Sequence, residues 1–173
     1  MKFSIFVLES LFLVVRIRAV KIQDKEASYQ RVWEKACAML DGERDEIAAM
    51  ATVASLLAGE FSYFFWTGFY RLVDGELLIG PYQGTPGCLR IALDRGVCGA
   101  AATACETLIV EDVHDFPGHI ACDTRSRSEI VVPVWNGQEE LIAVLDVDSE
   151  ELAAFDKVDQ RGLEKVVSLF MSL

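Results

Sequence analysis

The sequence predicts an α/β domain of the α+β kind, in which a mainly antiparallel sheet carries the N- and C-terminal helices packed together on one face. Three observations lead to this fold class. Helical periodicity dominates the two ends of the domain, the middle contains two hairpin patterns, and only a short helical stretch lies between them. Hairpins build antiparallel sheets, and an apolar sheet face needs helices to cover it. The second face is then left for loops, which favours a small-ligand pocket there.

The chain divides into an N-terminal extension, residues 1–23, and a single domain, residues 24–173. A length of 173 residues with 52% hydrophobic residues suits one domain with an ample core. Residues 3–20 are strongly apolar, but Glu9 and later arginines interrupt the run. A transmembrane helix needs about 20 mostly apolar residues, and no small-residue cleavage site of a signal peptide is evident. We therefore interpret residues 1–23 as an extension whose role the sequence leaves open.

Helices are expected at both ends of the domain. Residues 24–58 have apolar side chains at helical spacing on both sides of Asp41-Gly42, a dipeptide that predicts a break between two helices. Gly59 fits a helix stop. The last stretch, residues 156–173, has the pattern of an amphipathic helix.

The middle of the chain predicts two β-hairpins. The first spans residues 61–82, is rich in aromatic and β-branched residues, and has Asp-Gly at its turn. The second spans residues 129–149 and has Asn-Gly at its turn. Between them we expect a short helix over residues 99–105 and a short strand over residues 108–113, followed by a polar loop.

The charge of the chain disfavours two classes of partner. There are 16 Lys and Arg residues against 27 Asp and Glu residues, a formal net charge of −11. Such a chain lacks the basic surface that neutralises phosphates, so we expect no nucleic-acid partner. The same sign disfavours docking on anionic membranes.

Cysteines are the first candidate functional residues. An odd number of cysteines, five, in a domain with an ample core does not resemble a secreted disulfide scaffold, so we expect a reducing, cytoplasmic location. Cys37 and Cys105 lie in helical patterns, where a free thiol usually packs as a small apolar group. Cys88, Cys98 and Cys122 lie in polar or glycine-rich loops, where functional residues are more frequent.

The sequence does not decide which of the loop cysteines is reactive. Cys98 precedes the short helix, whose N-terminus would stabilise a thiolate. Cys122 is close in sequence to His119, which would lower the thiol pKa if charged, and to Asp123, which would raise it.

Other cysteine chemistries are less well supported. A zinc site from Cys88, Cys98, His119 and Cys122 is disfavoured because these residues do not form paired Cys-x-x-Cys units. A serine or cysteine hydrolase is disfavoured too, because the sequence has no nucleophile elbow.

Carboxylates and aromatic residues form a second candidate group. Asp146 and Asp148 alternate near the end of an apolar strand and so share a face, and Glu129 opens the preceding strand. They suit a pocket that binds an ammonium group or donates a hydrogen bond from a protonated acid, although a strand end in solvent would explain them too. Trp66 and Tyr70 share a strand face and suit a wall for a sulfur-bound methyl group, although core packing explains most strand aromatics.

Six long runs of the chain carry a family resemblance: WTGFY, LIGPYQGTPGCLRI, GVCGAAA, VEDVHDFPGHIACD, SEIVVPV and LIAVLDVDS. They resemble the free methionine-(R)-sulfoxide reductases, whose fold is a lone GAF domain, and the resemblance covers roughly residues 24–173. It implies that Cys122 is the nucleophile, Cys88 a resolving cysteine and Cys98 a third redox cysteine. It also implies a substrate pocket with a carboxylate group and an aromatic wall, formed by Glu129, Asp146, Asp148, Trp66 and Tyr70.

The resemblance implies a thiol mechanism. Reduction of free methionine-(R)-sulfoxide would leave a cysteine sulfenic acid, a disulfide would follow, and thioredoxin would restore the thiols, with no metal or organic cofactor. The sequence leaves a homodimer open. The alternative is a non-catalytic GAF domain that senses a small ligand or an oxidant.

Overall fold

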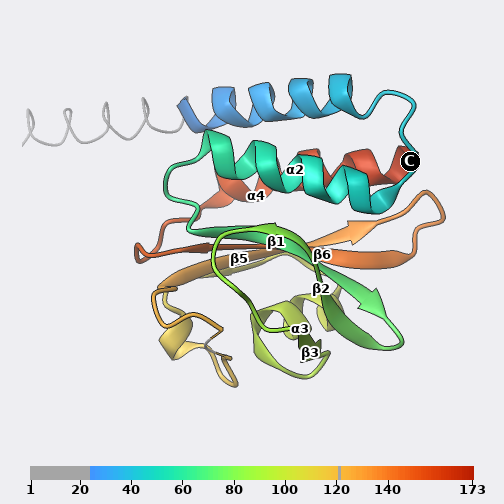
Figure 1. The fold of residues 1–173 in the computed structure, drawn as a ribbon. Coiled ribbons are helices and arrows are strands. Elements are labelled where there is room, and N and C mark those ends of the chain that lie inside the picture. The colour runs from blue at the N-terminus through green and yellow to red at the C-terminus, as the bar shows by residue number, and fades with distance from the viewer. Residues whose placement is uncertain (1–23, 121) are drawn as a thin grey trace, which may run out of the picture.

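The computed structural model describes residues 24–120 and 122–173, so the N-terminal extension expected at residues 1–23 lies outside the described residues. A helix over residues 24–39 opens the described chain (Figure 1). The later elements are α2 (Glu46–Glu60), β1 (Trp66–Val73), β2 (Glu76–Gln83), β3 (Arg90–Ala92), α3 (Gly96–Ala104), β4 (Leu108–Val110), a 3-10 turn (Val113–Asp115), β5 (Ser128–Trp135), β6 (Leu141–Ser149), α4 (Lys157–Val167) and a 3-10 turn (Ser168–Ser172).

Within the described residues, six strands form one antiparallel sheet in the order β3-β2-β1-β6-β5-β4. Both expected hairpins are present, as β1–β2 and β5–β6. At the first turn, Asp74 and Gly75 have φ values of 51° and 81°. Two positive φ values in a two-residue loop match the right-handed twist of the strands, which is why Asp-Gly forms this hairpin.

The sheet separates two layers (Figure 1). The helix over residues 24–39, α2 and α4 lie on one face, and α3 lies on the other. The terminal helices are therefore packed on one face, as expected. In β6, Leu145 and Val147 belong to the core under the terminal helices, while Val144 belongs to the smaller core under α3. Asp146 and Asp148 alternate with those residues and so face the α3 side.

Several local expectations were wrong. Gly59 does not end the second helix, because α2 continues to Glu60 and Phe61 is its C-cap. Cys105 does not pack in the core: it takes a left-handed φ of 57° at the C-cap of α3 and is exposed. Cys37 is only half-buried. The short strand β3 was not expected, and α3 begins at Gly96, earlier than expected. No helix of the described residues is long and apolar enough to cross a membrane.

Candidate active site

The strand register brings the predicted carboxylates together on the α3 face of the sheet. Asp148 on β6 lies directly opposite Glu129 on β5 and opposite Trp66 on β1. Asp146, two residues earlier on β6, is paired with Gly68 on β1. Glu129 and Asp146 are each only 6% exposed. The acidic strand ends therefore face a buried site, and the solvent-exposed interpretation is wrong.

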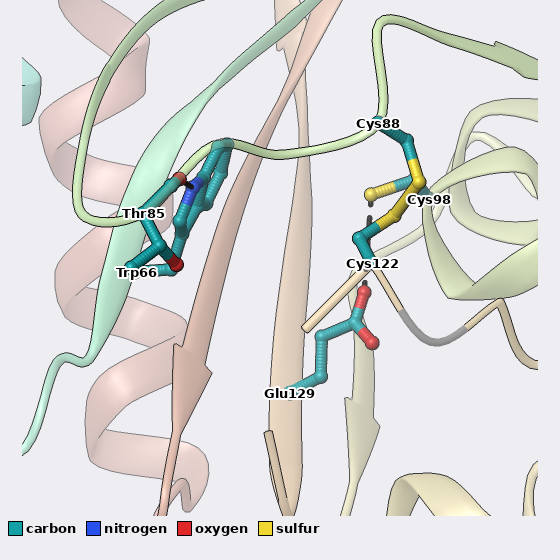
Figure 2. Close-up of a disulfide and its surroundings, with 6 residues drawn as sticks. All are labelled: Trp66, Thr85, Cys88, Cys98, Cys122 and Glu129. Carbon is teal, nitrogen blue, oxygen red and sulfur yellow. Dashed lines mark hydrogen bonds between the residues drawn. A yellow bond between two sulfur atoms is a disulfide. The ribbon is translucent and has the colours of Figure 1, made fainter. Parts of the chain in front are cut away.

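The predicted aromatic wall is also present. Trp66 and Tyr70 are both buried and stack, with ring centroids 5.7 Å apart. Gly68 between them has no side chain, and a Cβ there would lie 2.7 Å from an atom of the Trp66 ring. The ring therefore lies across the glycine. The ring also stacks on Tyr82, with ring centroids 5.3 Å apart. Trp66 Nε1 donates a hydrogen bond to the carbonyl oxygen of Thr85 at 2.9 Å (Figure 2).

The three loop cysteines meet at this site. Cys88, on the loop between β2 and β3, forms a disulfide with Cys122, on the loop before β5, with their Cα atoms 5.5 Å apart (Figure 2). Cys98 is a free thiol in the first turn of α3, and its Sγ donates to Glu129 Oε1 at 3.8 Å. Gly99 allows this position, because a Cβ there would lie 2.6 Å from the Ala92 carbonyl oxygen, so α3 packs directly on the backbone after β3.

These groups line one cavity. Its walls include all the predicted site residues except Cys88, which is bonded to the wall residue Cys122. The predicted members of the lining are Trp66, Tyr70, Cys98, Cys122, Glu129, Asp146 and Asp148. A pocket with apolar walls and a few convergent polar groups is the usual form of a small-molecule site.

Burial controls the charge of the carboxyl groups. It raises the pKa of Asp146 to about 7. Burial, together with the charge of Asp146, also raises the pKa values of Glu129 and Asp148 well above their usual range. Since like charges this close resist joint ionisation, the cavity holds at least one protonated carboxyl group near neutral pH. That group can donate a hydrogen bond or a proton to a ligand oxygen.

The expectation for Cys98 was wrong. It lies inside α3 rather than before it, and its thiol is buried. Burial, followed by the charges of Asp146 and Glu129, raises the pKa of the Cys98 thiol. Burial and the nearby carboxylates therefore keep Cys98 a neutral thiol, which donates to Glu129.

The surroundings of Cys122 are less acidic than the sequence suggests. Asp123 is paired with Arg125 at 2.9 Å, and hydrogen bonds from Arg125 and Thr85 keep the pKa of Asp123 well below its usual range. Its negative charge is thus partly compensated. Burial lowers the pKa of His119, so its imidazole is neutral at pH 7. Cys122 itself is an exposed residue in the wall of the cavity.

Two residues of the site were missed. Ser126 is buried in the cavity wall, where its hydroxyl opposes the rise in the pKa of Asp148. Thr85 donates from its hydroxyl to Asp123 Oδ2 at 2.8 Å and so joins the loops of Cys88 and Cys122. Both lie in polar loops without periodicity, where only the proximity to a candidate cysteine in the sequence would have pointed to them.

Comparison with known proteins places the chain in a family. Residues 43–172 match the GAF domain model. The chain is 46% identical to GAF domain-containing protein A of Dictyostelium discoideum, over 84% of this chain and 91% of that protein. It is 42% identical to the free methionine-R-sulfoxide reductase of Escherichia coli, over 76% of this chain and 79% of that protein.

A solved structure agrees with these relatives. The X-ray structure of free methionine-R-sulfoxide reductase from Neisseria meningitidis, in complex with its substrate, superposes with a TM-score of 0.81 at 40% identity, over 86% of this chain and 89% of that chain. The chain belongs to the free methionine-R-sulfoxide reductase family of GAF-domain oxidoreductases.

Proposed function

We propose that the protein reduces free methionine-(R)-sulfoxide to methionine, with Cys122 and Cys88 supplying the electrons. The observation that carries this proposal is the Cys88–Cys122 disulfide on a cavity that also contains buried carboxyl groups and stacked aromatic rings. The relative from Escherichia coli is described as a free methionine-R-sulfoxide reductase, and the Neisseria structure holds its substrate. Residues 24–173 contain every group that the scheme uses.

The cavity suits a free amino acid. A free methionine sulfoxide carries an ammonium group, which buried carboxylates bind through charge-assisted hydrogen bonds. Glu129, Asp146 and Asp148 supply these carboxylates. The rings of Trp66 and Tyr70 supply a surface for the methyl group and sulfur. A peptide-bound methionine lacks the ammonium group and would leave the carboxylates unpaired, which disfavours it.

Two thiols supply the two electrons that the reduction of one sulfoxide requires. The Cys122 thiolate attacks the sulfoxide sulfur while a protonated carboxyl group of the cavity gives its proton to the oxygen. The protonated oxygen passes to the Cys122 sulfur as the S–O bond of the substrate and the new bond between the two sulfur atoms break, so methionine leaves as the thioether and Cys122 becomes a sulfenic acid. The Cys88 thiol then attacks the sulfenic sulfur, water leaves, and the Cys88–Cys122 disulfide forms. Cys98 lines the same cavity as Cys122, which is compatible with a role as a third redox cysteine.

Recycling requires an external dithiol. Exposure of Cys122 allows thiol–disulfide exchange with a reductant, and thioredoxin is the proposed one. A disulfide that must be reduced in every cycle suits a reducing compartment, which supports a cytoplasmic location. The scheme uses no metal and no organic cofactor.

The test is an assay for methionine. The purified protein is mixed with dithiothreitol and with free, N-acetylated or peptide-bound methionine sulfoxide, each epimer separately. We expect turnover of the free R epimer and at least a hundredfold lower efficiency on the N-acetylated form. Comparable efficiency on the N-acetylated form would refute recognition of the ammonium group. No turnover of any form would favour a non-catalytic sensor.

A further inference from the structure

Three buried groups in the cavity have the arrangement of metal ligands. The Sγ atom of Cys98 and one carboxylate oxygen each from Glu129 and Asp146 lie within 4.8 Å of one another. The three residues come from α3, β5 and β6, which pack against each other. The separation between Cys98 Sγ and Glu129 Oε1 is already 3.8 Å (Figure 2).

A second observation concerns one oxygen atom of this cluster, which has no hydrogen-bond partner. Asp146 is 6% exposed, yet its Oδ1 atom accepts no hydrogen bond from any described residue. The same side chain lines the cavity. A buried carboxylate oxygen without a partner is costly, and native proteins usually satisfy such an atom with a donor, a water or an ion. A cation between the three groups would satisfy Asp146 Oδ1 directly.

The ligand types select the cation. Magnesium and calcium prefer six or more oxygen ligands, and a thiolate is a poor ligand for both. Zinc accepts sulfur at about 2.3 Å and carboxylate oxygen at about 2.0–2.2 Å in a tetrahedron, so its ligand atoms lie roughly 3.3–3.6 Å apart. The three ligand atoms lie within 4.8 Å of one another, so each pair would have to approach by at most about 1.5 Å to reach that spacing.

We propose that Cys98, Glu129 and Asp146 form a Zn²⁺ site in the cavity, with a fourth coordination position open to water. Binding replaces the thiol proton of Cys98 with a Zn–S bond, and the proton goes to solvent. The site differs from the set Cys88, Cys98, His119 and Cys122, because it shares only Cys98 with that set. The metal is an inhibitor rather than a cofactor, since it occupies the carboxylates proposed to bind substrate.

Metal binding itself does not rest on the proposed function, although inhibition does. The Cys88–Cys122 disulfide leaves Cys98 free, so the oxidised protein can be tested directly. Cys37 and Cys105 are the other free thiols among the described residues, and both are replaced by serine in the test protein. Cys98 is then the one described thiol available to a metal.

The experiment uses Co²⁺ as a spectroscopic probe. In the full-length oxidised Cys37→Ser/Cys105→Ser protein we expect one equivalent of Co²⁺ to give a thiolate-to-cobalt absorption band in the near ultraviolet, and Zn²⁺ to abolish it. Cys98→Ser should remove the band. Glu129→Gln and Asp146→Asn should each weaken binding at least tenfold, because each removes a charged ligand. Asp41→Asn, which alters an exposed carboxyl group outside the cavity, should have no effect.

The metal site would be overturned if Co²⁺ does not bind stoichiometrically. It would also be overturned if the Cys98→Ser protein gives an absorption band as strong as that of the protein with Cys98. If the protein has reductase activity, Zn²⁺ should raise the apparent KM for free methionine sulfoxide in an assay with a phosphine reductant, which competes less for zinc than a dithiol. A protein without reductase activity would refute the proposed function, while the Co²⁺ titration would still test the metal site.

Discussion

At the residue scale, Cys122 and Cys88 differ in exposure, and the scheme gives them different roles. Cys122→Ser should abolish methionine release, because a hydroxyl is a far poorer nucleophile than a thiolate. Cys88→Ser should still release about one methionine per protein without reductant, since the attack precedes resolution. Its steady turnover with thioredoxin should fall. Rapid-quench measurement of methionine separates the two results, with the exposed Cys105→Ser as the control.

Two results would change this assignment. Near-normal activity of Cys122→Ser would move the nucleophile to Cys98. If Cys88→Ser loses its single turnover as well, Cys88 takes part in the chemistry rather than in resolution. A Cys98–Cys122 disulfide in the oxidised wild-type protein, detected by peptide mapping, would make Cys98 the resolving cysteine.

The buried carboxyl group of Asp146 should make stability depend on pH. Its pKa is about 7 in the folded protein against 3.8 for an ordinary aspartate. Between these values the folded state binds more protons than the unfolded state, so the free energy of unfolding falls as the pH rises from 4 to 7. Asp146→Asn removes the ionisable group and therefore removes this loss of unfolding free energy. We expect the variant to be more stable by roughly 1–4 kcal/mol at pH 8 and similar to wild type at pH 4.

Urea denaturation of the disulfide form at pH 4, 6 and 8 measures the effect. Asp41→Asn, at an exposed position, provides the matched control and should show no such trend. A stability difference for Asp146→Asn that is constant across this pH range would contradict the assigned pKa.

At the element scale, local sequence patterns predicted the strands of the two hairpins, but not the register between strands or the short strand β3. Asp74-Gly75 fixes the first hairpin through two positive φ values, and the period of two places Asp146 and Asp148 on one face. Asn-Gly marks the second turn but is not a two-residue loop, because residues 136–140 join the strands and the positive φ lies at Glu139. The meeting of Asp148 with Glu129 depends on the β5–β6 register, which no local pattern specifies. The three-residue β3 forms only because β2 offers it an edge, so its short sequence gives no indication. The pKa of Cys98 could not be predicted either, because it depends first on burial of the thiol and then on carboxylates from two other elements.

Two loops carry the redox pair, and one side chain joins them. Asp123 accepts a hydrogen bond from the Thr85 hydroxyl at 2.8 Å and is fixed by Arg125, which lies over the ring of Phe65. This contact holds the loops of Cys88 and Cys122 together. Thr85→Val removes the hydroxyl but keeps the carbonyl that Trp66 uses. We expect the Cys88–Cys122 disulfide to become about 2–10-fold easier to reduce, which is the effect of one hydrogen bond.

The measurement is the thiol–disulfide equilibrium of the pair in defined dithiothreitol buffers. Thr52→Val on α2 is the matched control, since its hydroxyl bonds only within its own helix, to the Ala48 carbonyl. Equal equilibrium constants for wild type, Thr85→Val and Thr52→Val would show that the contact does not position the cysteines.

At the scale of the whole molecule, the sheet separates stability from chemistry. The larger core, together with the helix over residues 24–39, α2 and α4, lies on one face, and the cavity lies on the other. On the helical side, Asp159 is fully buried and accepts hydrogen bonds from Lys25 at 2.6 Å, Tyr29 at 2.9 Å and Tyr63 at 2.7 Å. This network ties the first described helix and the segment before β1 to α4.

Removing that carboxylate should lower stability and leave the reaction unchanged. In Asp159→Ala the Lys25 ammonium and two tyrosine hydroxyls lose a buried partner, which should cost about 2–4 kcal/mol of unfolding free energy. Glu26→Ala, which removes an exposed pair with Arg161, should cost less than about 1 kcal/mol. Urea denaturation measures both, and kcat and KM at a temperature where both variants are folded should match wild type, because the site lies across the sheet. A changed KM in Asp159→Ala would mean that the helical layer and the cavity are coupled through the strands.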